Sequence, residues 1–186
     1  MLENKIVLGI AGMPGAGKGV FRRTVKRHGY PVVTMGDEVR SEVKRRNLKP
    51  TPQNLSKVML NLRATEGPEA IAKRCIPKLV NTSGRIVIID GIRSLIEVNE
   101  FKNHFPNFIL IAIHASPKTR YGRLLRRKRS DDPVNWETFM ERDLRELGIG
   151  MGSVISLADY MIVNERTLFH LKQKIMIAMK EVLQDG

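Results

Sequence analysis

Short apolar runs alternate with amphipathic segments along most of the chain. The runs are nearly continuous in β-branched and aliphatic residues, a pattern that is typical of parallel strands buried on both faces. They predict strands at residues 5–11, 31–34, 86–90, 108–114 and 160–163. Because the segments between these strands have helical spacing, we expect an α/β domain in which right-handed crossovers connect parallel strands.

The amphipathic segments predict helices between the strands and one near the end of the sequence. In order, they cover residues 18–28, 37–46, 53–64, 68–81, 94–103, 117–128, 134–147 and 167–183. Three of them fall between the second and third strands, so residues from about 37 to 82 are expected to form a helical insertion beside the sheet. No repeat or linker interrupts the pattern, and we expect residues 1–186 to form a single domain.

The composition adds a strong positive charge to this picture. The 186 residues include 32 Lys and Arg against 19 Asp and Glu, which gives a net charge of +13. Seven of the basic residues lie in 118–129, a segment that contains no acidic residue and is followed closely by Asp131 and Asp132. Such an excess indicates polyanionic partners, and nucleic acid, acidic lipid and small phosphate esters would all satisfy it.

Other features narrow the class of protein. The apolar runs fall far short of the ~20 residues that a membrane-spanning helix needs, and residues 6–10 are too few for the core of a signal peptide. The single cysteine, Cys75, excludes an intramolecular disulfide and suits a reducing compartment, and the four histidines have no metal-ligand spacing. We therefore expect a cytoplasmic protein with no membrane partner.

A glycine-rich segment follows the first predicted strand directly. The spacing from Gly12 to Lys18 is that of a Walker A loop, and the flanking strand and helix are the expected context. Glycines let successive backbone N–H groups turn toward a phosphate, and the helix presents its positive end to the same anion. We expect Lys18 to reach the β- and γ-phosphates of ATP. The predicted phosphate-binding residues are Gly12, Met13, Pro14, Gly15, Ala16, Gly17, Lys18, Gly19 and Val20.

The metal that accompanies ATP needs a ligand from elsewhere. A Walker A loop usually places a Ser or Thr hydroxyl on Mg²⁺, but Gly19 occupies that position here. The third predicted strand ends in Asp90, and a carboxylate at the end of a buried strand is placed to orient Mg²⁺ or its waters beside the phosphates. The sequence therefore predicts ATP and Mg²⁺ as cofactors, with Asp90 holding the metal through water.

The phosphate loop resembles that of adenylate kinase and its relatives, which also have Gly after the Lys. Where that family usually has a Thr that contacts phosphate, this chain has Val20. The third strand continues as Asp90-Gly91-Ile92-Arg93, which resembles the Asp-Gly-Phe-Pro-Arg of nucleoside monophosphate kinases. The resemblance implies that Arg93 clamps the phosphate of the acceptor.

The segment after the second predicted strand carries the same resemblance. Residues 34–40, TMGDEVR, are similar to the Ser/Thr-x-Gly-Asp-x-x-Arg that opens the monophosphate-binding helix of the family. The resemblance implies that the insertion at about 37–82 binds the acceptor substrate. The acceptor residues that it implies are Thr34, Asp37, Arg40 and Arg93.

The basic segment at about 118–132 resembles a short lid. Residues 129–132, RSDD, followed by Arg142, are similar to the Arg-x-Asp-Asp and trailing Arg of adenylate-kinase-type enzymes, with Arg145 as the alternative to Arg142. Phosphoryl transfer needs cations around the transferred group, and arginine supplies two-pronged donors for its oxygens. The lid residues that we expect are Arg120, Arg123, Arg126, Asp131 and Asp132.

The end of the sequence adds a last match. Residues 158–164, ADYMIVN, look like the last-strand motif of dephospho-coenzyme A kinases, in which the following loop passes the adenine, so Asn164 is the candidate there. Together the matches resemble the small archaeal adenylate-kinase-related proteins, also described as dephospho-coenzyme A kinase-like. The implied fold is a P-loop NTPase of the nucleoside monophosphate kinase type, with a five-stranded parallel sheet and helices on both faces.

The resemblance implies an enzyme that transfers a phosphoryl group from ATP, with Mg²⁺, to a nucleoside monophosphate. Its catalytic residues would be Lys18, Asp90, Arg93, Arg129 and Arg142. The alternative acceptor is the ribose hydroxyl of dephospho-coenzyme A, for which Asp37 would serve as the base; Arg40 and Arg93 favour the monophosphate, whose anionic oxygen needs no base. A nucleotide-gated RNA-binding protein or regulatory ATPase is the other alternative, although only 5% of the residues are aromatic and could stack on bases.

Overall fold

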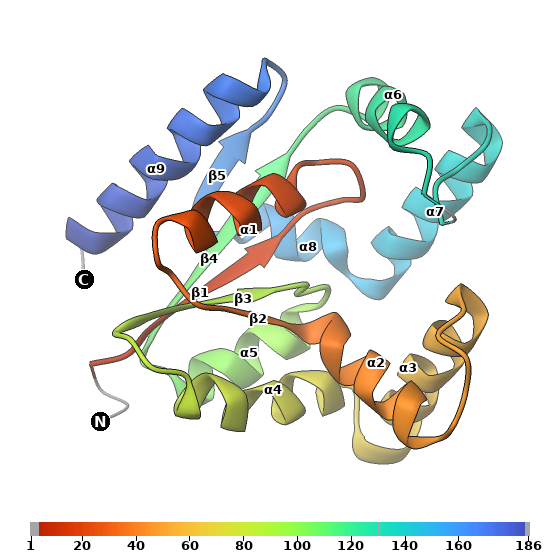
Figure 1. The fold of residues 1–186 in the computed structure, drawn as a ribbon, viewed down its shortest axis with the longest axis horizontal. Coiled ribbons are helices and arrows are strands. Elements are labelled where there is room, and N and C mark those ends of the chain that lie inside the picture. Colours follow the sequence, from red (N-terminus) through yellow and green to blue (C-terminus); the bar gives the residue numbers. More distant parts are fainter. Residues whose placement is uncertain (1–3, 130, 185–186) are drawn as a thin grey trace.

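Five strands form one parallel sheet, in the order β2-β3-β1-β4-β5 (Figure 1). They are β1 (Ile6–Ala11), β2 (Val32–Thr34), β3 (Ile86–Asp90), β4 (Asn107–His114) and β5 (Tyr160–Val163). The computed structural model describes residues 4–129 and 131–184. The predicted α/β class and the five-stranded parallel sheet are confirmed, and each strand lies within one residue of its predicted bounds.

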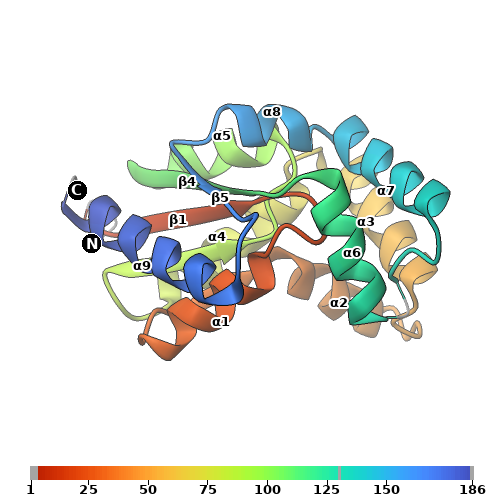
Figure 2. The same cartoon turned by 90° about the horizontal axis from the view of Figure 1, so that it is seen from above.

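Helices cover both faces of the sheet (Figure 2). One face is covered by α1 (Lys18–Arg27) and α9 (Leu168–Gln184), and the other by α4 (Ala70–Asn81), α5 (Leu95–His104) and α8 (Met151–Ser156). This arrangement confirms the predicted layers. None of the helices within residues 4–129 and 131–184 has the length and apolar composition needed to cross a membrane.

The remaining helices extend beyond the carboxyl ends of the strands (Figure 1). They are α2 (Met35–Arg45), α3 (Pro52–Glu66), α6 (Pro117–Arg127) and α7 (Trp136–Ile149). In open α/β sheets, ligands bind outside the carboxyl ends of the strands, where the order of the strands reverses. These helices therefore surround the edge of the sheet at which a site is expected.

Successive side chains of a strand point to opposite faces of the sheet, so a strand that is buried on both faces is apolar at nearly every position. In β1, Ile6, Leu8 and Ile10 pack in the core that contains α1 and α9, whereas Val7 and Ala11 pack in the core that contains α4 and α5. Both faces are thus buried, which accounts for the nearly continuous apolar runs in the sequence.

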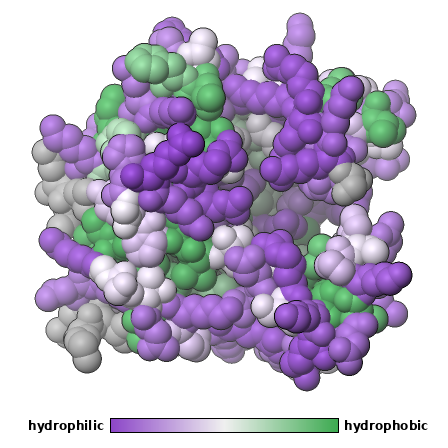
Figure 3. Space-filling model, viewed as in Figure 1, coloured by the Kyte–Doolittle hydropathy of each residue, from purple (hydrophilic) through white to green (hydrophobic). Residues whose placement is uncertain are grey.

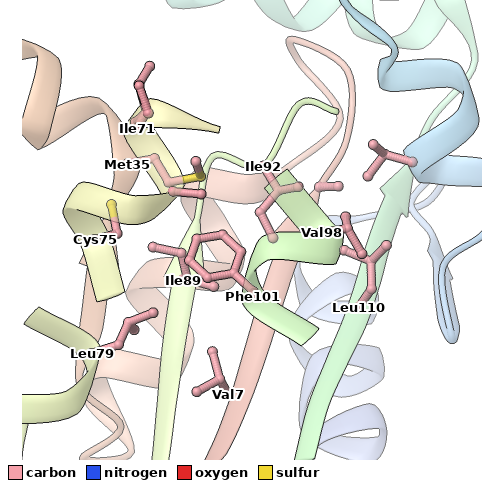
Figure 4. Packing of buried hydrophobic residues seen from close by; sticks show 14 of the residues in the cluster. Val7, Met35, Ile71, Cys75, Leu79, Ile89, Ile92, Val98, Phe101 and Leu110 are labelled. Atoms are coloured by element: carbon pink, nitrogen blue, oxygen red, sulfur yellow. The ribbon is translucent and has the colours of Figure 1, made fainter. Parts of the chain in front are cut away.

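The larger core joins the helices of the insertion to the sheet (Figure 4). Met35 of α2 lies in the same buried cluster as Ile71, Cys75 and Leu79 of α4 and Ile89 of β3. Burial raises the pKa of the Cys75 thiol to about 12, so this side chain behaves as a small apolar group. The inserted helices are therefore fixed on the sheet by a shared core.

Helix α8 is the element that the sequence pattern does not predict. It has six residues, MGSVIS, and follows Gly150, whose φ of 115° is a left-handed conformation that favours glycine. A helix this short gives less than two turns of apolar spacing, and its glycine and serines lower helix propensity. Its Met151 and Val154 side chains are nevertheless buried in the larger core, which stabilises the helix.

Replacing Phe101 by Ala tests the larger core. The Phe101 side chain is fully buried and stacks on Phe108, with ring centroids 5.7 Å apart. We expect the substitution to lower the free energy of unfolding by about 3–5 kcal/mol, because it leaves a cavity. In urea denaturation, the control Phe169→Ala should change stability by less than about 0.5 kcal/mol, since Phe169 is 65% exposed. Equal effects of the two substitutions would contradict this description of the core.

Candidate functional site

Two cavities meet at the carboxyl edge of the sheet. The large cleft has a volume of about 880 Å³ and lies between the phosphate loop, α6, α7 and the loop after β5. The small cavity, of about 360 Å³, lies between α2, α3 and the turn after β3. The residues that line both are Lys18, Arg22, Asp90, Gly91 and Arg93. Figure 3 shows the surface hollowed here, with hydrophilic side chains around the hollow.

The phosphate loop requires glycine at two positions, Gly12 and Gly15. Gly12 has a φ of 149°, and a Cβ atom there would lie 2.4 Å from the backbone oxygen of Ile113 in β4. Gly15 has a φ of 83°, and its Cβ atom would lie 2.9 Å from the backbone oxygen of Arg120 in α6. Larger residues would therefore push the loop away from the sheet and from α6.

Lys18 begins α1 and reaches back across the phosphate loop. Its Nζ donates hydrogen bonds to the backbone oxygen of Gly12 and to that of Met13, the latter at 3.4 Å. Burial lowers the pKa of Lys18 to about 8, and the negative charge of Asp90 only partly opposes this shift. A half-buried amine that lines both cavities is placed to bind the phosphate of a ligand, whose negative charge would restore its full protonation.

Asp90 stands at the carboxyl end of β3, opposite Ile10 of β1. Burial raises the pKa of its carboxyl group, while the charges of Lys18 and Arg22 act in the opposite direction. The Nη1 atom of Arg22 lies 3.5 Å from Oδ2. The other oxygen, Oδ1, is buried and has no hydrogen-bond partner among the described residues. A carboxylate oxygen in this condition suits a hard cation.

Mg²⁺ fits this residue set. It usually keeps several water ligands and binds through one or two carboxylates together with substrate phosphates. Within the described chain, no group of three His, Cys, Asp or Glu residues could hold a metal by itself, so the expected arrangement is a single carboxylate with phosphate oxygens and water. Asp90 is the residue that would hold it, and Gly19 contributes no hydroxyl.

Arginines from α6 and α7 form the wall of the large cleft opposite the sheet. Of the residues predicted for the lid and its trailing arginine, those that line the cleft are Arg123, Arg126, Arg129, Asp131 and Arg142. Arg145 is not among the described residues that line it. The basic residues that line it without having been expected are Arg22, Arg23, Lys118, Arg127 and Arg166.

The two adjacent aspartates, Asp131 and Asp132, hold arginines in place. Arg142 donates to the backbone oxygen of Asp131 at 2.6 Å and to its Oδ2 at 3.0 Å. Arg127 donates from Nε to Oδ2 of Asp132 at 2.9 Å, and the same oxygen accepts the backbone N–H of Arg129 at 2.9 Å. Contacts within the protein therefore fix these arginines, and this reduces the ordering that ligand binding requires.

The prediction that Arg120 is a lid cation is wrong, because its side chain is only 4% exposed and is fully engaged inside the protein. It donates two hydrogen bonds to the carboxylate of Asp143 in α7, one of them 2.8 Å long. It also donates to the backbone oxygens of Ala115, at 3.0 Å, and Pro14, at 3.2 Å. Arg120 therefore braces the phosphate loop against α6 and α7.

Asn164 follows β5 and lines the large cleft, where the sequence expected an adenine loop. Its Nδ2 donates to the backbone oxygen of Ala16 at 2.7 Å, and its Oδ1 accepts from Arg123 at 3.2 Å. The next residue, Glu165, accepts a hydrogen bond from the hydroxyl of Thr119 in the first turn of α6 at 2.6 Å. The loop after β5 is thus tied both to the phosphate loop and to α6.

Three of the four predicted acceptor residues, Thr34, Arg40 and Arg93, line the small cavity. Asp37, the fourth, is not among the described lining residues, and its side chain is 58% exposed. The Nε atom of Arg40 donates to Oδ1 of Asp37 at 3.0 Å, an i,i+3 pair on the surface of α2. Arg93, in turn, donates to Glu146 of α7 at 3.2 Å, which joins the two cavity walls.

Some lining residues had a signal in the sequence and others had none. Arg22 lies one helical turn after Lys18, so the two side chains share a face of α1 and could have been paired by spacing. Arg63 and Glu97 line the small cavity from α3 and α5 and form an ion pair of 2.7 Å. They are 34 residues apart, and no local pattern connects them.

Comparison with known proteins matches most of the chain. Residues 11–140 match the family described as AAA domain. UPF0200 protein MJ1399 of Methanocaldococcus jannaschii is 46% identical over 182 residues, which are 97% of this chain and 92% of that protein. UPF0200 protein PH1008 of Pyrococcus horikoshii is 44% identical over 184 residues, 97% of this chain and 99% of the relative.

Solved structures share the fold. Shikimate kinase from Acinetobacter baumannii, in complex with shikimate, has a TM-score of 0.59 at 13% identity. The match covers 100% of this chain and 97% of the chain of that kinase. A gluconokinase from Sinorhizobium meliloti has a TM-score of 0.58 at 13% identity, and the match covers 98% of this chain and 95% of the chain of the gluconokinase. These identities establish the fold alone, which is P-loop kinase-like.

The lowered pKa of Lys18 predicts that a polyphosphate ligand, with ATP as the probe, causes uptake of a proton when it binds. With a pKa of about 8, the unliganded amine is mostly neutral at pH 8.5, and polyphosphate should restore its charge. Calorimetric titrations at pH 8.5, in buffers of different ionisation enthalpy, should show uptake of about 0.8 proton per ATP. At pH 7.0, a pH well below the pKa, the contribution from Lys18 should be small.

The control is Lys18→Arg, which keeps a permanent charge and should remove the uptake at pH 8.5. The account of Lys18 is contradicted if binding enthalpies of the unaltered protein at pH 8.5 do not depend on the buffer.

Replacing Arg120 by Met tests the brace. The substitution leaves the buried carboxylate of Asp143 without its partner, so we expect a loss of about 3–5 kcal/mol in the free energy of unfolding, measured by urea denaturation. Arg126→Met on the same helix is the matched control and should cost less than about 1 kcal/mol, because Arg126 is exposed. A double variant, Arg120→Met with Asp143→Leu, should recover part of the loss, and similar values for the two single variants would rule out the brace.

Proposed function

The chain belongs to the AAA-domain family and to the archaeal UPF0200 family, and from this premise we propose that it is a P-loop kinase. It transfers the γ-phosphoryl group of ATP, with Mg²⁺, to a small phosphorylated acceptor, and the acceptor that best suits the site is a nucleoside monophosphate. The observation that carries the proposal is the junction of the two cavities at Lys18, Asp90 and Arg93. A donor in one cavity and an acceptor in the other would meet there.

The donor belongs in the large cleft. The phosphate loop presents its backbone N–H groups and the positive end of α1 to the phosphates, and Lys18 is positioned for the β- and γ-phosphates. Bound Mg²⁺ would supply charge stabilisation on the β- and γ-oxygens, and Asp90 would hold it. Arg142 and Arg129 lie on the opposite wall, where they can bind the equatorial oxygens of the transferred group.

The acceptor belongs in the small cavity, with its phosphate on Arg93 and Arg40 and the rest of the molecule against the apolar side chains of α2 and α3. Those side chains are Met35, Val39, Leu55 and Met59. Holding both anions at the junction makes the transfer effectively intramolecular, the main contribution that a protein makes to this reaction. The positioned arginines also exclude water, which would otherwise accept the phosphoryl group.

The position of Asp37 favours a monophosphate over a ribose hydroxyl. A hydroxyl acceptor benefits from a carboxylate base, and Asp37 was the candidate for dephospho-coenzyme A. Its side chain is exposed, paired with Arg40 and outside the small cavity. A monophosphate oxygen is already anionic and needs no base.

An ADP-release assay with AMP, CMP, UMP, GMP, dTMP and dephospho-coenzyme A as acceptors tests the proposal. We expect Mg²⁺-dependent turnover with at least one monophosphate, and Lys18→Ala should lower kcat by about 10²–10³-fold, because it removes a charge that stabilises the transferred group. Arg145→Ala, on α7 but not among the described cleft-lining residues, is the control and should leave kcat unchanged.

Three outcomes would overturn the proposal. They are ADP release that is independent of every acceptor, turnover with dephospho-coenzyme A alone, and full activity in Lys18→Ala. RNA binding that survives Lys18→Ala without any phosphoryl transfer would favour the nucleic-acid alternative instead.

A further inference from the structure

A further arginine lines the small cavity, in addition to Arg40 and Arg93, which we assign to the acceptor phosphate. Arg63 of α3 lines the small cavity, and its side chain is 16% exposed. It stands on the same face of α3 as Met59, one helical turn earlier, which also lines the cavity. A charged group that is largely buried needs hydrogen-bonding partners, and the donors that these partners leave unused determine what the wall can bind.

Glu97 of α5 fixes this arginine. Its carboxylate is only 1% exposed, and its Oε1 accepts a hydrogen bond from Nη2 of Arg63 at 2.7 Å. Its Oε2 accepts the backbone N–H of Arg93 at 2.8 Å, so both oxygens are occupied. One buried carboxylate therefore positions Arg63 relative to Arg93, the residue assigned to the acceptor phosphate.

Arg63 keeps donor capacity after this pairing. Its Nε is buried and has no hydrogen-bond partner within the described part of the chain. Nη2 is the only guanidinium nitrogen with a described bond. A guanidinium can only donate hydrogen bonds, so its free N–H groups need oxygen or nitrogen acceptors. The Nη1 atom also has no described bond and is not among the shielded atoms, so an acceptor substrate that brings an oxygen to this wall can accept a hydrogen bond from it. An amino group at the same place would add a further donor instead.

We infer that Arg63, positioned by Glu97, selects a nucleoside monophosphate whose base carries a carbonyl oxygen, as in uracil, thymine or hypoxanthine-type bases, over one with an amino group at that place. This inference rests on the proposed function where it is tested by kcat/KM, because that measurement requires phosphoryl transfer. The apolar lining from α2 and α3 would contact the faces of the base, and Arg63 would donate to the oxygen on its edge. The small cavity thus discriminates between bases of the same size by hydrogen bonding rather than by shape.

Matched pairs of monophosphates test the inference. UMP and CMP differ by an oxygen against an amino group at one position of the ring, and IMP and AMP differ in the same way. We expect kcat/KM to be about 10- to 100-fold higher for the oxygen-bearing member of at least one pair, the range expected for one hydrogen bond from a charged donor. Equal values, or a preference for CMP and AMP, would overturn the inference and leave the kinase proposal intact.

Variants assign the preference to Arg63. Arg63→Gln should lower the UMP/CMP or IMP/AMP ratio toward one, because an amide can both donate and accept. Since this variant leaves Glu97 buried without its charged partner, a second variant, Arg63→Gln with Glu97→Gln, carries a neutral pair of similar shape. Lys57→Gln, exposed on the same helix, is the control and should keep the ratio of the unaltered protein. A preference that persists in both Gln variants, with thermal unfolding showing them folded, would contradict the role of Arg63.

A binding measurement separates this inference from the proposed function. Calorimetric titration of the unaltered protein with UMP, CMP, IMP and AMP, without ATP, needs no turnover. If no monophosphate is phosphorylated but UMP or IMP binds about tenfold more tightly than its partner and loses this advantage in Arg63→Gln, the kinase proposal fails and the assignment of Arg63 stands. Binding without preference would overturn the assignment.

Discussion

The parallel pairing of β1 with β3 places two opposite charges at one edge of the sheet, the buried Asp90 and the half-buried Lys18. Ile10 lies opposite Asp90 in the register, and the phosphate loop that leaves β1 carries Lys18 to the same place. Burial lowers the pKa of Lys18 and raises that of Asp90, so the two groups stabilise each other only in part. A polyphosphate and a divalent cation would supply the missing charges, and the rest of the site is arranged around this requirement.

The surroundings hold that edge rigidly. Arg120 fixes the backbone at Pro14, Asn164 fixes it at Ala16, and the close approach of Gly12 to β4 leaves no space for a side chain. The walls of both cavities are held by further hydrogen bonds. In the large cleft, the aspartates after α6 hold arginines, and at the small cavity Glu97 holds the backbone of Arg93. Contacts within the protein therefore position its cations, and this reduces the entropy cost of ligand binding.

Features set by neighbouring residues could be predicted from the sequence, whereas those that join distant residues could not. The strands and the phosphate loop follow from apolar runs and glycine spacing, which are local. Arg120 and Arg123 lie on one helix, three residues apart, yet only Arg123 lines the cleft, because Asp143, 23 residues away, draws Arg120 into the interior. The same limit explains why Arg63 was missed: its partner Glu97 is brought near by the packing of α3 and α5 beside the sheet.

The central claim is that one junction serves both cavities, with Lys18 and Asp90 at the donor phosphates and Arg93 at the acceptor. A crystal structure of the protein with Mg²⁺ and a non-hydrolysable ATP analogue measures this directly. The account predicts the terminal phosphate within hydrogen-bond distance of the Nζ atom of Lys18, the metal between that phosphate and Asp90, and the free phosphate oxygens facing Arg93. Phosphates bound away from Lys18, or a terminal phosphate directed away from the small cavity, would contradict it.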